Sequence, residues 1–314
     1  MSALAAGQNP FFFLIDFELK KPLICPLEDA KKMGFQFEVK GFRNFDPRVR
    51  KPTPKNLSIS PVPKAIYTQA YQRVVKEIYS GNTFLLNLTF PSAIETHLNL
   101  EDIFHLAKAP YKLLQQDHFV VYSPECFVKI KDSRIYSYPM KGTIDAHLPE
   151  AKKKLETNPK EINEHNTIVD LIRNDLSKVA KEVQVTRFRY VDKIKTQKNE
   201  IYHTSSEIKG KLSADWKTQL PNILFGMLPA GSICGAPKAK TVSIIQEVEQ
   251  GPRGYYTGVF GYFDGENFDS AVNIRYLEKK GDQLLYRSGG GITFLSELES
   301  EYNELIEKIY VPVV

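Results

Sequence analysis

Short apolar runs separated by charged turns fill the first 45 positions, and such runs are typical of strands in a small sheet. The run from Phe11 to Ile15 follows a proline and has no basic leader, so it predicts a buried strand and not a signal peptide. Residues 46–63 hold five prolines, a density that favours an extended connector over a helix. From Lys64 to Ser80 apolar residues recur at helical spacing, and Gly81 can cap this helix.

Two further helices are predicted by their start signals. Asn158 before Pro159 is a typical helix start, and this helix can continue to about Ala180. Near the C-terminus, Ser296 with Glu299 predicts a capping box at the start of a last amphipathic helix.

Strand-like runs come in groups between these helices. The runs at 119–122, 126–130 and 135–138 are joined by short polar turns and predict an antiparallel meander. Because strands and helices are grouped and do not strictly alternate, the pattern favours an α+β fold in which helices cover antiparallel sheets. Further strands are predicted at 183–191, 256–263, 270–277 and 284–288.

Composition describes a soluble globular chain of 314 residues, with 42% hydrophobic and 25% charged residues. The net charge of +5 comes from scattered Lys and Arg, and the short run Lys152 to Lys154 is better explained as a solvated helix face than as a nucleic-acid site. No apolar stretch approaches the roughly 20 residues that cross a membrane. The three cysteines lie far apart without a C-x-x-C pair, which favours a reducing compartment. The expected location is therefore the cytoplasm.

Two helices carry pairs of glutamates at helical spacing. Glu161 and Glu164 are three residues apart, as are Glu301 and Glu304, so each pair shares one helix face. If both helices face one cleft, the four carboxylates repel one another unless a cation lies among them, and all-oxygen ligands favour Mg²⁺. Spacing alone favours the simpler interpretation that both pairs lie on ordinary solvated helix faces. A di-iron bundle is disfavoured because His165 directly follows Glu164 instead of standing three residues on.

Lys141 and two glycine-rich segments are the other candidates for chemistry. Lys141 follows a predicted strand and becomes a nucleophile if its pKa is lowered, although a lysine at a strand end is usually a surface residue. The segment Leu228 to Lys238 precedes an amphipathic stretch, where backbone amides suit an anion. Gly289 to Gly291 allow a ligand to approach the backbone closely. Both glycine segments also fit ordinary turns.

These signals, in this order, resemble one family, the chorismate-utilising enzymes. Its members include anthranilate, isochorismate, salicylate and aminodeoxychorismate synthases. The resemblance covers residues from about 65 to 309. The matching segments are Ser123–Phe127, Pro139–Thr143, Glu164–His165, Asp170–Leu176, His203–Ser206, Gly231–Lys238, Tyr256–Gly258, Ile274–Arg275, Gly289–Ile292 and the Glu301/Glu304 helix.

The resemblance implies a single catalytic domain over 1–314, with 1–63 as a reduced region of strands and connector. Its fold would be two packed antiparallel sheets surrounded by helices, with the site in a cleft between them. Mg²⁺ would be held by Glu161, Glu164, Glu301 and Glu304, and would bind the ring carboxylate of chorismate.

The resemblance also assigns roles inside the pocket. Glu125 would be the general acid that protonates the departing C4 hydroxyl, with His203 in a supporting role. Tyr256 and Arg275 would contact the enolpyruvyl carboxylate. The pocket would be completed by Gly142, Thr143, Gly289, Gly291 and Lys308.

Two positions select among the relatives. The lysine within Pro-x-x-Gly-Thr is usual in members that make aminodeoxychorismate, whereas other members usually carry alanine, and here it is Lys141. The implied mechanism has its amine attack C2 of chorismate before ammonia attacks C4. Water-adding members carry a lysine base at the position that the resemblance matches to Leu85 in this chain.

The aminated product would keep its enolpyruvyl group and feed 4-aminobenzoate and folate synthesis. Ammonia would come from a separate glutamine amidotransferase subunit, because neither Cys126 nor Cys234 stands in a glutaminase elbow. Two other functions stay open, namely anthranilate synthase component I and a catalytically silent chorismate-binding subunit.

Overall fold

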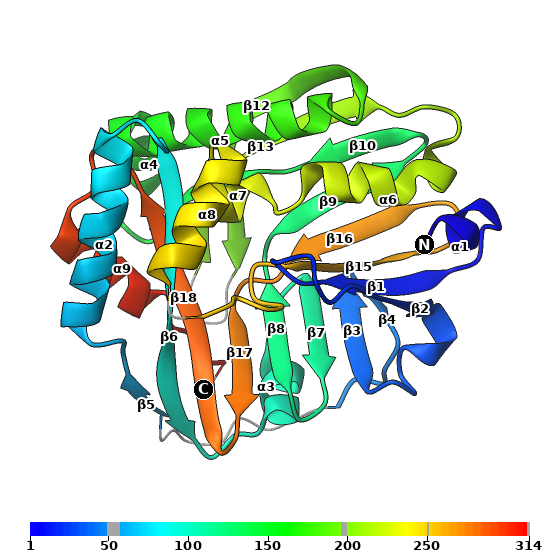
Figure 1. Cartoon of the computed structure of the whole chain (residues 1–314), viewed down its shortest axis with the longest axis horizontal. Coiled ribbons are helices and arrows are strands. Elements are labelled where there is room, and N and C mark those ends of the chain that lie inside the picture. Colours follow the sequence, from blue (N-terminus) through cyan, green and yellow to red (C-terminus); the bar gives the residue numbers. More distant parts are fainter. Residues whose placement is uncertain (49–56, 196–199, 250, 313–314) are drawn as a thin grey trace.

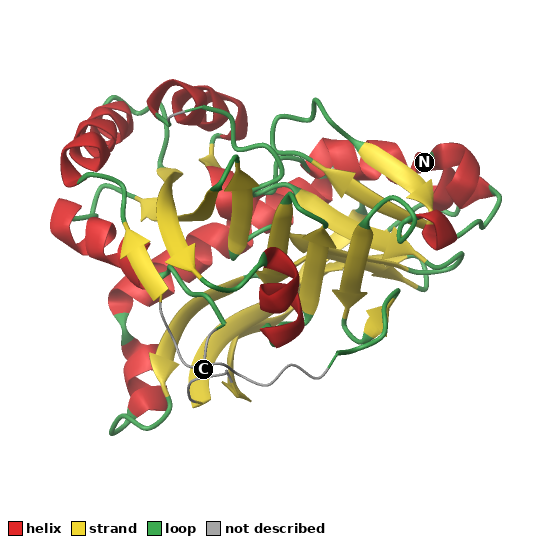
Figure 2. Cartoon of the chain, turned by 90° about the horizontal axis from the view of Figure 1, so that it is seen from below, coloured by secondary structure: helices red, strands yellow, loops and turns green. Residues whose placement is uncertain are grey.

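The computed structural model describes residues 1–48, 57–195, 200–249 and 251–312. Two antiparallel sheets pack face to face, and helices surround them (Figure 1). Figure 2, a view turned by 90°, shows strands in the middle of the molecule and most helices at its periphery. The predicted α+β fold of two packed sheets is therefore confirmed.

The first sheet, sheet A, has β9 and β16 near its centre. In the described part of the chain it contains nine strands, and all its pairings are antiparallel. Their order is β11 (Met140–Asp145), β13 (Glu200–Lys211), β10 (Arg134–Ser137), β9 (Cys126–Lys131), β16 (Phe268–Val272), β15 (Val259–Phe263), β1 (Phe11–Ile15) and β2 (Leu23–Pro26), with β12 (Lys181–Lys195) paired to β13.

The second sheet, sheet B, is built around the long strands β6 and β18. Within the described ranges it also has nine antiparallel strands. Their order is β14 (Gly235–Ala236), β6 (Leu85–Thr96), β18 (Gln283–Ile292), β17 (Tyr276–Lys280), β8 (Phe119–Ser123), β7 (Tyr111–Gln115), β3 (Phe35–Val39) and β4 (Phe42–Arg43), with β5 (Leu57–Ser60) paired to β6.

Helices cover the outer faces of both sheets. The predicted helices at 64–80 and from Pro159 are confirmed as α2 (Lys64–Tyr79) and α5 (Pro159–Ser177). No helix in the described residues is both long enough and apolar enough to span a membrane. The other helical elements are α1 (Ser2–Ala6), η1 (Leu27–Asp29), α3 (Leu100–Leu106), α4 (Ala151–Thr157), α6 (Trp216–Met227), α7 (Gly231–Cys234), α8 (Lys238–Val248) and α9 (Leu298–Glu307).

The apolar core forms three layers that follow this architecture. Strand β1 is buried on both faces, as the sequence predicts for Phe11 to Ile15. Phe12 and Leu14 join the layer between the sheets, which also holds Phe37 and Val121 of sheet B. The opposite face of β1 joins a second layer under helices α2, α6 and α8. A third layer lies beneath α3 on the outer face of sheet B. Burial on this scale is the main force that holds the sheets together.

The structure corrects the predicted meander and the predicted strand at 270–277. Strand β8 belongs to sheet B, whereas β9 and β10 belong to sheet A, so residues 124–125 cross between sheets. The strand predicted at 270–277 is likewise two strands, β16 in sheet A and β17 in sheet B. The local alternation of apolar residues is the same in both sheets, so it does not reveal which sheet a strand joins.

Two smaller predictions also change. Part of the predicted connector is strand β5, and positions 49–56 lie outside the described residues. The predicted capping box is wrong, because α9 begins after Glu297 without a side-chain cap. The Ser296 hydroxyl instead accepts a hydrogen bond from the Thr293 N–H at 3.1 Å.

Candidate functional site

The site is built on the two segments that cross between the sheets. Residues 124–125 join β8 to β9, and residues 273–275 join β16 to β17. The crossings are bound to each other, since the Val272 N–H donates to the Glu125 carbonyl at 3.1 Å and the Tyr122 N–H donates to the Arg275 carbonyl at 3.2 Å. Arg275 adopts a left-handed backbone with φ of 54°, which turns the chain sharply. Glu125 and Arg275 are thus held side by side between the sheets.

A cavity of about 690 Å³ opens at these crossings. It is larger than a small diacid requires and lies within the usual range of ligand pockets. Eight of the sequence-predicted site residues line it, namely Glu125, Lys141, Glu164, Tyr256, Arg275, Gly289, Gly291 and Lys308. Six others lie outside its lining, namely Gly142, Thr143, Glu161, His203, Glu301 and Glu304.

Glu125 is held by a hydroxyl that the sequence analysis missed. The Ser232 Oγ donates to Glu125 Oε1 at 2.5 Å from the short helix α7. Burial raises the pKa of Glu125, and the hydrogen bond from Ser232 and the charge of Lys141 oppose this rise without cancelling it. A carboxyl with a raised pKa is suited to donate a proton. Ser232 lies in the glycine-rich segment already singled out, but only the fold brings it to Glu125.

Lys141 lies on β11 and extends into the cavity. Its Nζ is 2.7 Å from Glu164 Oε2. Burial alone would lower the pKa of Lys141, but the carboxylates of Glu164, Glu304 and Glu161 outweigh it and raise the pKa above its ordinary value. In this state the side chain is an ammonium ion, so it must lose a proton before it can act as a nucleophile.

The two glutamate pairs project from helices α5 and α9, and each pair lies close to a glycine of a neighbouring strand. A Cβ at Gly290 would lie 3.2 Å from Glu304 Oε1 and 3.3 Å from Glu301 Oε2, and a Cβ at Gly142 would lie 2.7 Å from Glu161 Oε2. Glycine therefore leaves room for the carboxylates at both places. Lys141 Nζ lies 2.7 Å from Glu164 of α5, and the charge of Glu304 of α9 also favours its protonated form.

The cluster suits a hard divalent cation by its chemistry, since its donors are carboxylate oxygens. As the side chains stand, no group of three His, Cys, Asp or Glu in the described residues is arranged to hold a metal ion. Lysines supply the positive charge instead, with Lys141 on Glu164 and with Lys308 Nζ at 2.6 Å from Glu304 Oε1. The chemical type of the ligands thus suits Mg²⁺, and the carboxylate oxygens would have to move closer together to coordinate it.

A neighbouring part of the cavity wall, which begins at the Lys308–Glu304 pair, is cationic. Arg275 Nη1 donates to the Lys308 carbonyl at 3.0 Å, and Lys308 Nζ donates to the Gly289 carbonyl at 3.0 Å. Burial lowers the pKa of Lys308, helped by the charges of Lys141 and Arg275 and opposed by Glu304. Tyr256 is buried beside this wall. Such a surface attracts carboxylates, and Arg can bind one through two hydrogen bonds.

His203 lies on β13, opposite Thr143 of β11, and does not line the cavity. Burial lowers its pKa, and Asp192 opposes this only in part, so the ring is neutral near pH 7.

An apolar wall completes the cavity. Leu85, Phe84 and Phe294 line it together with Ile168. A Cβ at Gly291 would lie 3.0 Å from Leu85 Cδ1, so the leucine side chain rests directly on the glycine strand. A leucine here has no group that could activate water.

Comparisons with known proteins agree with this geometry. The sequence profile of the chorismate binding enzymes matches residues 26–313. The chain is 56% identical over 307 residues to an uncharacterized PabA-like protein of Pasteurella multocida, covering 98% of this chain and 95% of that protein. It is 30% identical over 279 residues to aminodeoxychorismate synthase component 1 of Bacillus subtilis, covering 84% and 58%. It is 33% identical over 264 residues to anthranilate synthase component 1 of Leptospira biflexa, covering 78% and 56%.

The fold itself has a counterpart among solved structures. The 2,3-dihydroxybenzoate-specific isochorismate synthase from Bacillus anthracis superposes with a TM-score of 0.72 at 20% identity, covering 98% of this chain and 85% of that one. At this identity the likeness concerns the fold alone.

Proposed function

The chain belongs to the chorismate binding enzyme family, and on this premise we propose that it aminates chorismate to 4-amino-4-deoxychorismate. The observation that carries the proposal is Lys141, which points into the cavity lined by Glu125 and Arg275. A side-chain amine beside a buried acid can replace a hydroxyl in two steps instead of one. Aminodeoxychorismate synthase component 1 of Bacillus subtilis, at 30% identity, supports the same reaction class.

Substrate binding follows from the charges of the two walls. The cationic wall of Arg275 and Lys308 would take the enolpyruvyl carboxylate, with Tyr256 beside it. Glu161, Glu164, Glu301 and Glu304 would hold Mg²⁺. Bound there, the ion would attract the ring carboxylate and neutralise the charge of Glu164 that now keeps Lys141 protonated.

The first chemical step joins the lysine to the ring. The neutral amine of Lys141 attacks C2, both conjugated double bonds of the ring shift by one position so that a C4–C5 double bond forms, and the C4–O bond breaks. Glu125 gives its proton to the departing hydroxyl, which leaves as water. Ser232 holds Glu125 Oε1, so the other carboxyl oxygen is available for the proton.

The second step reverses the first with a different nucleophile. Ammonia attacks C4, both double bonds shift back to their original positions, and the C2–N bond breaks with its electron pair returning to the Lys141 amine. One proton from the new ammonium group returns to Glu125. The sum is chorismate plus ammonia giving aminodeoxychorismate plus water, with the enzyme unchanged. Leu85 beside the reacting ring offers no base for water, which favours ammonia as nucleophile.

The ammonia source in this proposal is a glutamine amidotransferase subunit. In the described residues all three cysteines, Cys25, Cys126 and Cys234, are buried. Burial raises the pKa of each thiol, which makes none of them a good glutaminase nucleophile. The product would serve 4-aminobenzoate and folate synthesis.

The main alternative is anthranilate formation, because anthranilate synthase component 1 of Leptospira biflexa is similar at 33% identity. That reaction would leave Lys141 without a chemical task. If the chain were a silent binding subunit, Glu125, Lys141 and the carboxylate pairs would have no chemical task.

One experiment separates these functions. The purified chain is incubated with chorismate, Mg²⁺ and excess ammonium, a second sample lacks ammonium, and products are identified by mass. We expect an aminated product that retains the enolpyruvyl group, formed only with ammonium. Anthranilate would replace the proposal by the alternative. No product, even when a glutaminase partner is supplied, would favour the silent subunit.

A further inference from the structure

The carboxylate of Glu18, in the N-terminal segment, is hydrogen-bonded to the loop at 251–258. Glu18, just after β1, accepts hydrogen bonds from two consecutive backbone N–H groups. Arg253 N lies 2.8 Å from its Oε1, and Gly254 N lies 3.0 Å from its Oε2. The Phe17 N–H returns a bond to the Gly254 carbonyl at 2.8 Å. Both carboxylate oxygens are thus used to fix the start of the loop at 251–258.

The turn that presents Glu18 is itself rigid. Asp16 is only 2% exposed, and its carboxylate accepts from Lys21 N at 2.6 Å and Lys20 N at 3.0 Å. Leu19 adopts a left-handed backbone with φ of 59° within this turn. A side chain carried on such a turn loses little entropy when it binds its partner.

The side chain of Arg253 connects this loop to two residues that line the cavity. Its side chain is 2% exposed and pairs with Glu249 through two hydrogen bonds of 2.6 and 2.9 Å. Its remaining donors reach the Ile233 carbonyl at 2.9 Å and the Asn87 carbonyl at 2.6 Å. A buried guanidinium is stable only when its N–H groups are hydrogen-bonded. These bonds therefore fix the positions of the segments around Asn87, Ile233 and Arg253 relative to one another.

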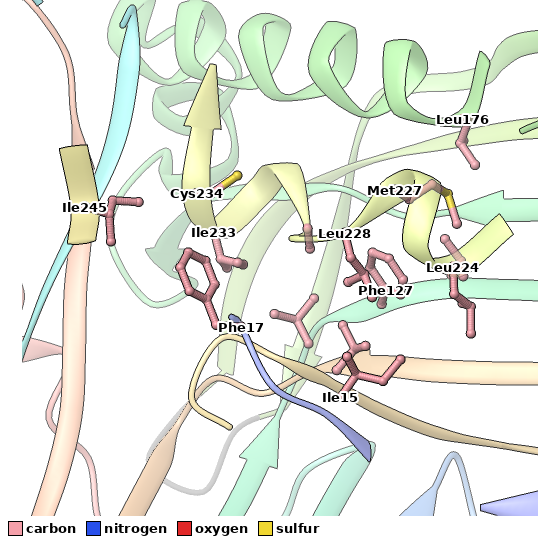
Figure 3. Close-up of a cluster of buried hydrophobic side chains, with 14 of the residues drawn as sticks. Ile15, Phe17, Phe127, Leu176, Leu224, Met227, Leu228, Ile233, Cys234 and Ile245 are labelled. Carbon is pink, nitrogen blue, oxygen red and sulfur yellow. The ribbon is translucent and has the colours of Figure 1, made fainter. Parts of the chain in front are cut away.

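Phe17 closes the network from the N-terminal side. The guanidinium carbon of Arg253 lies 4.6 Å from the centre of the Phe17 ring. Figure 3 shows this ring beside Ile233 of α7, which belongs to the glycine-rich loop, the segment from Leu228 to Lys238. The N-terminal segment therefore supports Arg253 by side-chain stacking as well as by hydrogen bonds.

Each of the three segments joined by Arg253 contributes a residue to the cavity wall. Asn87, Ile233 and Tyr256 line it, and Tyr256 stands three residues after Arg253. Glu18 lies outside the residues 26–313 that match the family profile. We propose that Glu18 is a positioning residue, which holds Arg253 and thereby places Tyr256 and the glycine-rich loop for binding of the substrate's carboxylate. The choice of chorismate as substrate rests on the proposed function.

The test compares Glu18→Ala with Glu28→Ala in the full chain. Glu28 is an exposed carboxylate of the same N-terminal region, so its loss controls for charge. Three quantities are measured for each variant, namely the dissociation constant for chorismate, the backbone amide exchange of residues 253–257, and the melting temperature. Glu18→Gln is a conservative variant, because the amide keeps one acceptor oxygen.

We expect Glu18→Ala to weaken chorismate binding about tenfold and to speed exchange at residues 253–257, while the melting temperature stays near that of Glu28→Ala. Glu18→Gln should restore part of the affinity. Unchanged affinity and exchange would overturn the proposal, and so would faster exchange throughout the chain with a matching fall in melting temperature. Binding and exchange do not depend on amination, so these results stand apart from the test of the reaction.

Discussion

The two halves of the site are built in different ways. One half consists of the two segments that cross between the sheets, residues 124–125 and 273–275. Backbone hydrogen bonds at these segments fix the positions of Glu125 and Arg275. The other half stands on helices α5 and α9, whose glutamates reach the site with long side chains. Strand crossings fix atoms through the backbone, whereas helix side chains keep rotamer freedom. The crossing half is therefore suited to hold reacting groups in place, and the helical half to rearrange when a cation binds.

Lys141 stands between these halves, and its removal should have the largest effect. Lys141→Ala deletes the proposed nucleophile without touching either crossing. We expect the amination rate to fall about a thousandfold or more, measured as aminated product by mass. Lys152→Ala, which removes an exposed lysine on α4, should leave the rate unchanged. An unaltered rate in Lys141→Ala would contradict the covalent route and make Lys141 a counter-ion of Glu164.

The helical half is tested by removing one carboxylate charge. Glu301→Gln keeps the size of the side chain, and we expect the Mg²⁺ concentration for half-maximal activity to rise at least about tenfold. Glu299→Gln is the matched control, because Glu299 lies on the same helix with 67% of its side chain exposed. Equal Mg²⁺ requirements in both variants would show that α9 does not hold the ion.

The anchoring of α5 gives the smallest predicted effect. His165 is fully buried, and its Nε2 lies 2.7 Å from the Ser206 hydroxyl. Burial, together with the charge of Arg189, lowers the pKa of His165 to about 4. The unfolded chain binds this proton at higher pH than the folded one, so stability is lost as pH falls below about 6.5.

We expect this histidine to account for about 1 kcal/mol of lost unfolding free energy between pH 7 and pH 5.5. The measurement is denaturant unfolding of the wild type and of His165→Gln at both pH values. The glutamine cannot titrate, so its pH dependence should be shallower by that amount. Parallel pH curves would show that the pKa of His165 is the same in the folded and the unfolded chain, which would contradict the prediction.

The helical half was the easier one to predict from the sequence. Glu161 with Glu164, and Glu301 with Glu304, share a helix face by spacing alone, and in the structure Glu161, Glu164 and Glu304 lie close enough to Lys141 to raise its pKa. Helix spacing also places Lys308 four residues after Glu304, and the two side chains form an ion pair of 2.6 Å at the end of α9. Spacing did not reveal the partner of Glu164, because Lys141 reaches it from strand β11.

The crossing half was harder, because its key events are long-range. Residues 270–277 alternate like one strand, yet the chain changes sheets at Asn273 to Arg275. Ser123 and Pro124 look like a turn in a meander for the same reason. The Ser232 contact with Glu125 and the Glu18 contact with Arg253 span 107 and 235 positions, and no local pattern encodes such pairs. The family resemblance suggested the proposed role of Glu125, and the fold showed its hydrogen-bond partner Ser232.

The position of the crossings has a consequence for how such a protein can diverge. They lie in the interior of both sheets, whereas β2, β4 and β12 lie at their edges. Edge strands can lengthen, shorten or disappear in related chains without displacing the interior strands on which Glu125 and Arg275 depend. Natural variation in length should therefore accumulate at the sheet edges, while the catalytic geometry is inherited unchanged.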